Sequence, residues 1–189
     1  MNTSQAAPAA LKILVAGGFG VGKTTLVGAV SEVAPLHTEE YMTRASVGVD
    51  DLAGVGEKET TTVALDFGRI TINSDLVVYL FGTPGQERFW FMWNDLVHGA
   101  LGGVVIADTR RLDSSFASID FFESRRIPFV VAINCFHGRN TRTADEIRTA
   151  LDLDPYVPLL IGDVRERSYG KETLLALVDH LDRLNAPAA

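Results

Sequence analysis

The sequence contains one cysteine, Cys135, and four histidines that stand far apart. A lone cysteine excludes an internal disulfide, and the scattered histidines give no zinc-ligand spacing. No apolar run approaches the roughly 20 residues that a membrane-spanning helix needs. We therefore expect a protein of the reducing cytoplasm, with any membrane association made through partners.

Basic residues are also in short supply. The chain has 17 lysines and arginines against 24 acidic residues, a formal net charge of −7. An acidic chain gains nothing from counterion release and is repelled by anionic lipid. The start lacks the basic and apolar segments of a secretory signal, and the end lacks a cysteine to prenylate. We expect no nucleic acid partner and no direct membrane anchor.

What the sequence does contain is enough apolar residue for one full core: 47% of its 189 residues are hydrophobic. We expect a disordered N-terminal tail over residues 1–10, one domain over residues 11–185 and a short C-terminal tail over residues 186–189. No repeat and no internal domain boundary is visible.

Short apolar stretches alternate with amphipathic ones along the domain. The expected strands are Leu11–Ala16, Val63–Ile72, Asp75–Phe81, Leu101–Ala107, Ile127–Ile133 and Val157–Ile161. The expected helices are Lys23–Val33, Asp113–Ser124, Thr143–Leu151 and Lys171–Leu184. The alternation predicts an α/β fold with a mostly parallel sheet, and Asn73-Ser74 predicts one hairpin. Residues 34–62 lack steady periodicity, which in a compact domain is typical of a functional loop.

The strongest motif is a phosphate-binding loop. Gly17–Thr24, GGFGVGKT, matches G-x-x-x-x-G-K-[ST] between a predicted strand and a predicted helix. Its glycines let backbone N–H groups surround phosphate, Lys23 reaches phosphate oxygens, and the Thr24 hydroxyl can ligate Mg²⁺. The nucleotide-binding residues expected here are Gly17, Gly18, Phe19, Gly20, Val21, Gly22, Lys23, Thr24 and Thr25.

Four further segments follow in an order that a known family shares. They are Thr60–Gly68 (TTTVALDFG), Thr83–Phe89 (TPGQERF), Asn134–His137 (NCFH) and Asp163–Arg165 (DVR). With the phosphate loop they resemble the Ras-like small GTPases, from about Leu11 to Leu184. The wording TPGQERFWFMW, then ADTRRLDSSF, is closest to the bacterial branch, the small GTPases of actinobacterial conservon operons, which are related to gliding-motility GTPases.

The resemblance implies a P-loop small-GTPase fold with a six-stranded mixed sheet. It implies a GTP-dependent switch that hydrolyses GTP slowly to GDP and phosphate with Mg²⁺. Gln86 would orient the attacking water, and Gly85 would donate its N–H to the γ-phosphate. The first switch would end at Thr60–Gly68, where Thr62, with Thr61 as the alternative, would bind Mg²⁺ and sense the γ-phosphate. The second switch would begin at Thr83–Phe89. The implied partners are a Roadblock/LC7-type protein and sensor-kinase-like signalling proteins.

Two residues depart from the family pattern. Gly82 stands where an aspartate usually holds Mg²⁺ through water, which puts tight Mg²⁺ binding in question. Phe19 replaces a small residue, and its ring either crowds an incoming arginine or packs on the first switch. In this reaction an arginine that stabilises the charge of the transition state raises the rate greatly. Arg44, Arg69 and Arg88 could supply such an arginine from within the chain.

The base-reading segment departs as well. Asn134 is retained, but Cys135 replaces the lysine and His137 the aspartate that accepts two hydrogen bonds from guanine. His137 either faces the base or is only a loop histidine, in which case backbone groups near Val164, together with Asp163, would read the guanine. Because one charged pair is lost, we expect modest selectivity over ATP. The base-contacting residues expected are Asn134, His137, Asp163, Val164 and Arg165. Cys135 is interpreted as a small buried filler.

An aromatic stretch follows the second switch. Helical spacing places Phe89, Met92 or Trp93, and Leu96 on one core face. Trp90 and Phe91 then point elsewhere, to a partner or to a neighbouring helix. The rival functions are a nucleotide-binding scaffold without hydrolysis, a purely structural interaction module, and a P-loop protein that accepts both ATP and GTP.

Overall fold

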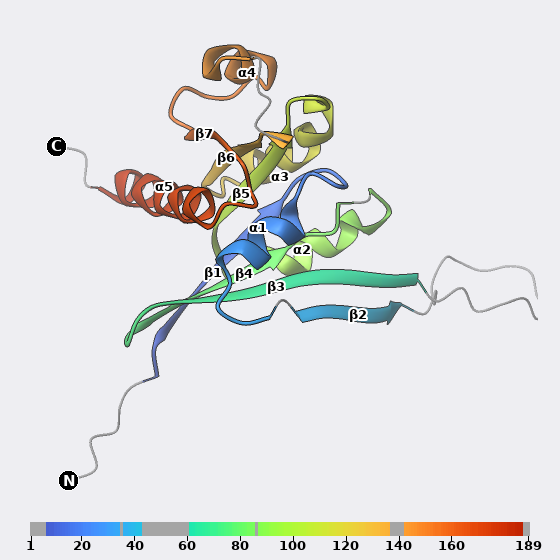
Figure 1. The fold of residues 1–189 in the computed structure, drawn as a ribbon, viewed down its shortest axis with the longest axis vertical. Helices are drawn as coiled ribbons and strands as arrows, with labels where there is room; N and C mark the ends of the chain where they lie inside the picture. The colour runs from blue at the N-terminus through green and yellow to red at the C-terminus, as the bar shows by residue number, and fades with distance from the viewer. Residues whose placement is uncertain (1–6, 35, 43–60, 86, 137–141, 187–189) are drawn as a thin grey trace, which may run out of the picture.

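A single seven-stranded sheet forms the centre of the molecule (Figure 1). The computed structural model describes residues 7–34, 36–42, 61–85, 87–136 and 142–186. The strands are β1 (Ala9–Ala16), β2 (Leu36–Met42), β3 (Thr61–Asn73), β4 (Leu76–Gly82), β5 (Ala100–Asp108), β6 (Phe129–Asn134) and β7 (Leu159–Gly162). Their order is β2-β3-β4-β1-β5-β6-β7.

Five of the strands are parallel, and β3 runs antiparallel to both β2 and β4. This confirms the predicted α/β P-loop fold with a mixed, mostly parallel sheet and one hairpin. The sheet has one strand more than the six expected. Strand β3 is 13 residues long, and its first half extends beyond β4 and pairs with β2. The sequence of β2 has no alternating pattern, so only this pairing identifies it as a strand.

Helices cover both faces of the sheet (Figure 1). They are α1 (Lys23–Val30), α2 (Trp93–Leu96), α3 (Phe116–Ser124), α4 (Ala144–Ala150) and α5 (Arg167–Asn185), with 3₁₀ turns η1 (Glu87–Met92) and η2 (Leu112–Ser115). The helix predicted over Lys23–Val33 ends earlier because Ser31 turns extended, and its hydroxyl accepts hydrogen bonds from the N–H groups of Val33 and Arg69.

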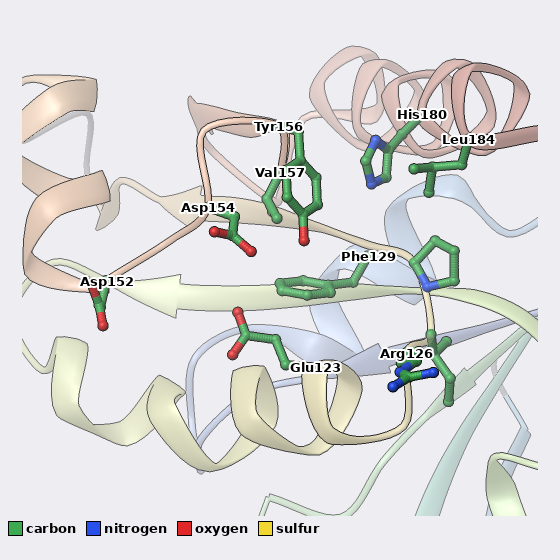
Figure 2. A pocket seen from close by; sticks show the side chains of 11 residues that line it. Glu123, Arg126, Phe129, Asp152, Asp154, Tyr156, Val157, His180 and Leu184 are labelled. Atoms are coloured by element: carbon green, nitrogen blue, oxygen red, sulfur yellow. The ribbon is translucent and has the colours of Figure 1, made fainter. Parts of the chain in front are cut away.

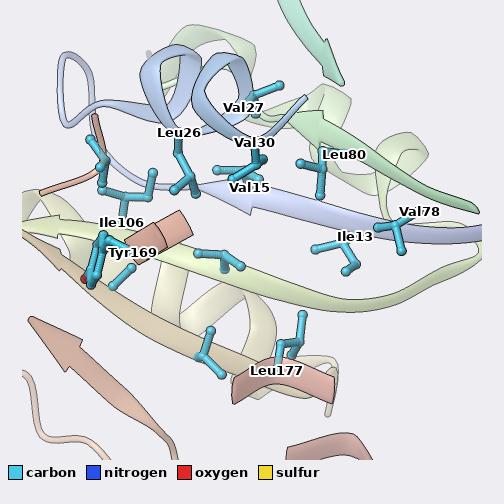
Figure 3. Close-up of a cluster of buried hydrophobic side chains, with 14 of the residues drawn as sticks. Ile13, Val15, Leu26, Val27, Val30, Val78, Leu80, Ile106, Tyr169 and Leu177 are labelled. Carbon is cyan, nitrogen blue, oxygen red and sulfur yellow. The ribbon is translucent and has the colours of Figure 1, made fainter. Parts of the chain in front are cut away.

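The alternation of side chains along β1 divides the core into two layers. Ile13 and Val15 belong to the cluster under α1 and α5, shown in Figure 3, and Leu14 and Ala16 belong to the cluster under α2, α3 and α4. All four side chains are buried, so β1 is covered on both faces. The loop that follows β1 therefore starts from a strand held on both sides. None of the helices in the described ranges combines the length and apolar character that a membrane crossing requires.

Tyr169 joins α5 to the two strands that lead into the expected base-reading loops. Its buried hydroxyl lies 3.0 Å from the carbonyl oxygen of Ile133 in β6 and 3.1 Å from that of Leu160 in β7. Burial, then the nearby Cys135 thiol, raises the pKa of this phenol, so it stays protonated and donates.

Tyr169→Phe is expected to lower the free energy of unfolding by about 1 kcal/mol, the net worth of one buried hydrogen bond. Chemical denaturation measures it. The matched control is Tyr79→Phe, because the Tyr79 hydroxyl makes no hydrogen bond to a described residue and its ring stacks on Phe67 in either form. Equal losses in the two variants would contradict a bridging role for Tyr169.

Candidate functional site

The phosphate loop runs from the end of β1 to the start of α1, and two of its residues can only be glycine. Gly17 and Gly22 have φ angles of 140° and 112°, in the left-handed region. A Cβ on Gly17 would lie 2.4 Å from the Ile106 carbonyl oxygen, and one on Gly22 would lie 2.9 Å from Asn134 Nδ2. The loop is therefore pressed against β5 on one side and against the end of β6 on the other.

Lys23 lies inside this loop. Its ammonium donates to the carbonyl oxygens of Gly17 and Gly18 at 2.8 and 2.7 Å, and only 9% of the residue is exposed. A Cβ on Gly85 would lie 2.5 Å from Lys23 Nζ, so the residue expected to meet the γ-phosphate adjoins the lysine. Burial lowers the pKa of Lys23 to about 8, although the Asp66 charge acts in the opposite direction.

Thr24 is paired with a carboxylate from another strand. Its hydroxyl donates to Asp66 Oδ2 at 2.7 Å, and Asp66 lies in β3 with 8% of the residue exposed. A hydroxyl has one proton and two lone pairs, so a proton held by Asp66 leaves the lone pairs for a cation.

Asp66 also explains the glycine at position 82. The two residues are directly paired across β3 and β4. A Cβ on Gly82 would lie 2.8 Å from Asp66 Cβ and 2.9 Å from Asp66 Oδ2. The space next to Gly82 is thus filled by a carboxylate that the neighbouring strand provides. The aspartate missing from the family pattern has a counterpart one strand away.

These oxygens suit Mg²⁺, which prefers hydroxyl, carboxylate and phosphate oxygens. Thr24 would hold the ion directly, and Asp66 is the carboxylate in its vicinity. Thr62 is the second residue of the same strand and pairs with Tyr41 of β2, and its side chain lies outside the described residues.

Asn134 holds three segments together. Its amide nitrogen donates to the Val21 carbonyl oxygen in the phosphate loop at 2.9 Å. Its amide oxygen accepts from the backbone N–H of Val164 at 3.3 Å, in the loop after β7. Only 3% of Asn134 is exposed. The predicted phosphate loop and the two predicted base-reading segments are therefore one connected site.

Two residues of the expected base-reading segments, Asp163 and Cys135, have contacts within the protein. The Asp163 carboxylate accepts bidentate hydrogen bonds from Nε and Nη2 of the Arg165 guanidinium. Cys135 is buried, and burial followed by the Asp163 charge raises the pKa of its thiol, which fits the predicted small filler. His137 lies outside the described residues.

A second carboxylate stands beside Asn134. Asp108, 1% exposed, pairs with Asn134 across β5 and β6. Burial alone would raise the pKa of Asp108, but hydrogen bonds from Arg110 outweigh it and hold the pKa below its usual value. The Arg110 guanidinium also lies over the Phe136 ring, with Cζ 4.0 Å from the ring centroid. The sequence analysis did not single out this pair.

The structure adds an arginine that sequence reasoning missed. Arg111 Nη2 donates to the Phe19 carbonyl oxygen at 3.1 Å, on the outer side of the phosphate loop. The Phe19 ring is 67% exposed. Of the arginines proposed as internal sources, Arg69 lies on β3 opposite Tyr79. Arg44 and the side chain of Arg88 lie outside the described residues.

The aromatic stretch anchors the second switch. Trp93 is 2% exposed, as predicted for the core face, and its indole N–H donates to the Pro84 carbonyl oxygen at 3.1 Å. Trp90 and Phe91 are 37% and 54% exposed. A cavity of about 510 Å³ lies beside the phosphate loop, where Gly85 and Trp90 face residues at the start of α3. Gln86 lies outside the described residues, and Thr25 is exposed on α1.

Asp66 and Arg111 carried weak sequence signals. Asp66 was visible as the only acid in the apolar strand pattern VALDF, where a charged residue facing a core needs a reason. Arg111 lies three residues after the last residue of β5, at the carboxyl end of the parallel strands where ligands of α/β sheets bind. Neither signal names a partner, because both contacts join residues far apart in the chain.

Gly82→Asp is expected to destabilise the fold by about 2–4 kcal/mol, because it crowds Asp66 and sets two carboxylates side by side. The double variant Asp66→Gly/Gly82→Asp moves the carboxylate to the other strand and should recover at least half of that loss. Urea unfolding of the two single variants and the double variant measures the coupling. Strictly additive losses would show that the two positions do not share one space.

Nucleotide affinity is expected to fall as the pH rises above 8. A bound phosphate favours charged Lys23, so the lysine takes up a proton on binding wherever it is neutral in the free protein. From a pKa of about 8, affinity should fall roughly five- to tenfold between pH 7.5 and 9. Titration with a fluorescent nucleotide measures it. Lys23→Arg keeps its charge and should lose this slope, so equal slopes would assign the titration elsewhere.

The fold is shared with known G domains. The G domain of the FeoB iron transporter of T. maritima superposes with a TM-score of 0.62, at 16% identity, over 91% of this chain and 99% of that one. The FeoB G domain of Methanococcus jannaschii gives a TM-score of 0.59, at 15% identity, over 92% and 98%. At these identities the likeness shows the fold alone.

Two further comparisons show a closer similarity in sequence. An uncharacterized protein of Methanocaldococcus jannaschii is 32% identical over 126 residues, which are 66% of this chain and 69% of that protein. A family described as conserved hypothetical ATP binding proteins matches residues 15–183, nearly the whole domain. The match includes the phosphate loop, Asp66 and Asn134. The chain is a P-loop nucleotide-binding protein with a G-domain fold, and it belongs to this family.

Proposed function

We propose that this protein is a GTP-binding switch that hydrolyses GTP slowly to GDP and phosphate. One observation carries the proposal: Lys23 Nζ, the Thr24–Asp66 pair and Gly85 meet around the phosphate loop. A scaffold that binds no nucleotide would not need a buried lysine whose ammonium donates hydrogen bonds to two backbone carbonyl oxygens. Phosphate oxygens are stronger acceptors for the same protons.

Each residue has a distinct role in the proposal. Lys23 and the loop N–H groups hold the phosphates, and Thr24 with Asp66 holds the site for Mg²⁺. The ion would neutralise charge on the phosphate oxygens. Gln86 orients the attacking water, and the Gly85 N–H meets the γ-phosphate. With Asp66 present, the glycine at position 82 is compatible with a working hydrolase.

The contacts in the structure define the phosphate site more closely than the base site. The Asn134 amide is hydrogen-bonded to Val21 and to the Val164 N–H, and the Asp163 carboxylate is engaged by Arg165. The family description names ATP, and the G-domain fold is shared with GTP-type proteins. ATP/GTP promiscuity is therefore the second candidate, and a nucleotide-bound scaffold without hydrolysis is the third.

The finer resemblance supports the remaining parts of the proposal. Conservon-type and gliding-motility GTPases act in the cytoplasm with Roadblock/LC7-type and sensor-kinase-like proteins, and we infer the same classes of partner here. Loss of the γ-phosphate would release both switches from their contacts, which is how a partner would distinguish the two states. Exposed Trp90 and Phe91 are suited to that contact.

Gln86→Leu is expected to slow phosphate release at least tenfold and to leave nucleotide affinity within twofold, because leucine fills similar space but cannot orient water. Single-turnover assays with GTP and with ATP measure both the rate and the preferred base. The control is the other glutamine, Gln5→Leu. Equal rates for the wild type and Gln86→Leu would remove Gln86 from the mechanism, and stronger competition by ATP would favour the second candidate.

A further inference from the structure

A second cavity lies at the opposite end of the sheet from the phosphate loop. Its volume is about 520 Å³, and its apolar wall includes Phe129, the first residue of β6, and Val157, which precedes β7. The Asn134 contacts are at the other end of β6, roughly 17 Å away along the strand. The two sites are therefore separate.

Acidic side chains converge on this cavity. Figure 2 shows the carboxylates of Glu123 and Asp154 directed from opposite sides toward the space beside Phe129 and the Tyr156 hydroxyl. Burial, and then the charges of Asp154, Asp120 and Asp152, raises the pKa of Glu123. The wall holds three carboxylates against the single guanidinium of Arg126, which leaves a net charge of −2.

His180 is the independent sign of a ligand. Its imidazole projects from α5 into the wall of the cavity (Figure 2), and only 3% of the residue is exposed. The ring stacks on Tyr156 with 6.2 Å between the ring centroids. It makes no hydrogen bond to any residue in the described part of the chain. Burial, and then the charge of Arg183, lowers the pKa of His180, so the ring is neutral at pH 7 and has one nitrogen that can accept a hydrogen bond.

Two backbone features place further charged groups at the same cavity. Helices α3 and α4 each end in a motif closed by paired backbone hydrogen bonds, whose left-handed residue is most often glycine. Here those residues are Arg126 (φ 54°) and Asp152 (φ 51°), the only non-glycine residues with positive φ in the described ranges. Both line the cavity. Glycine would relieve the backbone at each position but would remove a charge from the wall.

The chemistry of the wall selects among ligands. Net negative charge disfavours an anion. No group of His, Cys, Asp and Glu side chains among the described residues is close enough to hold a metal ion. Spread-out carboxylates, an aromatic ring and apolar side chains suit a larger cation with a hydrocarbon part. We propose that this cavity binds an alkylammonium group, as carried by a short diamine or by a lysine side chain.

The test is NMR titration of the full-length protein with 1,4-diaminobutane, followed at the backbone signals of Phe129, Val157 and His180. Neutral 1,4-butanediol should bind at least tenfold more weakly. Blocked lysine, N-acetyl-lysine methylamide, separates the sources: tighter binding than the diamine assigns a protein side chain, and weaker binding assigns a free amine. Shifts that are absent with both amines, or equal with the diol, would overturn the proposal.

Three variants test the groups named. Glu123→Gln/Asp154→Asn should weaken diamine binding at least tenfold, and His180→Phe, which retains the stack on Tyr156, should weaken it several-fold. Asp182→Asn, an exposed acid on α5, should leave the affinity within twofold. Equal losses in this control and in the double variant would mean nonspecific attraction of amines to an acidic chain, and would overturn the site.

Asp152→Gly separates a ligand role from a purely structural one. Relief of the left-handed backbone should raise the thermal midpoint by about 2–4 °C, while the loss of the carboxylate should weaken diamine binding several-fold. A more stable protein with unchanged diamine affinity would remove Asp152 from the site.

Discussion

The nucleotide site depends on the two hydrogen bonds that the Asn134 amide makes to Val21 and Val164. The phosphate loop, the end of β6 and the loop after β7 are far apart in the sequence, and this amide fixes their distances from one another. Gly22 makes the approach possible, since a side chain there would strike both Asn134 and Val164. A phosphate-binding loop positioned in this way is preorganised before its ligand arrives, so little ordering remains to be done on binding.

The sequence predicted those features whose physics is local. The phosphate loop is encoded by glycines that its own backbone requires, and the hairpin is encoded at Asn73, whose side chain accepts a hydrogen bond from the N–H of Asp75. Contacts between strands could not be predicted from the sequence, because the register of each strand is set by the whole sheet. From the sequence alone Asp66 is therefore one strand residue among others, and its relation to Gly82 is visible only in the pairing of the two strands. Likewise, β2 has no pattern of its own.

A further helix boundary departs from the prediction because a tertiary contact sets it. Helix α5 begins before the expected Lys171 and includes Gly170, where a Cβ would meet Val30 of α1 at 2.4 Å. The ends predicted for α3 and α4, at Ser124 and Leu151, lie within one residue of those observed, although Arg126 and Asp152 stand where glycine ends a helix most easily. The described non-glycine residues with positive φ lie at the cavity, whereas three of the glycines with positive φ, Gly17, Gly20 and Gly22, lie in the phosphate loop.

The exchange of Gly82 and Asp66 has a consequence for how such chains can diverge. The two positions share one space, so a chain with an acid at both is crowded, and a chain with glycine at both has no carboxylate beside Thr24. Neither single step leads from one arrangement to the other without passing through a weakened protein. The carboxylate can therefore move from one strand to the other only when both positions change. A motif search that inspects only the position before Thr83 would miss the carboxylate that Asp66 places beside Thr24.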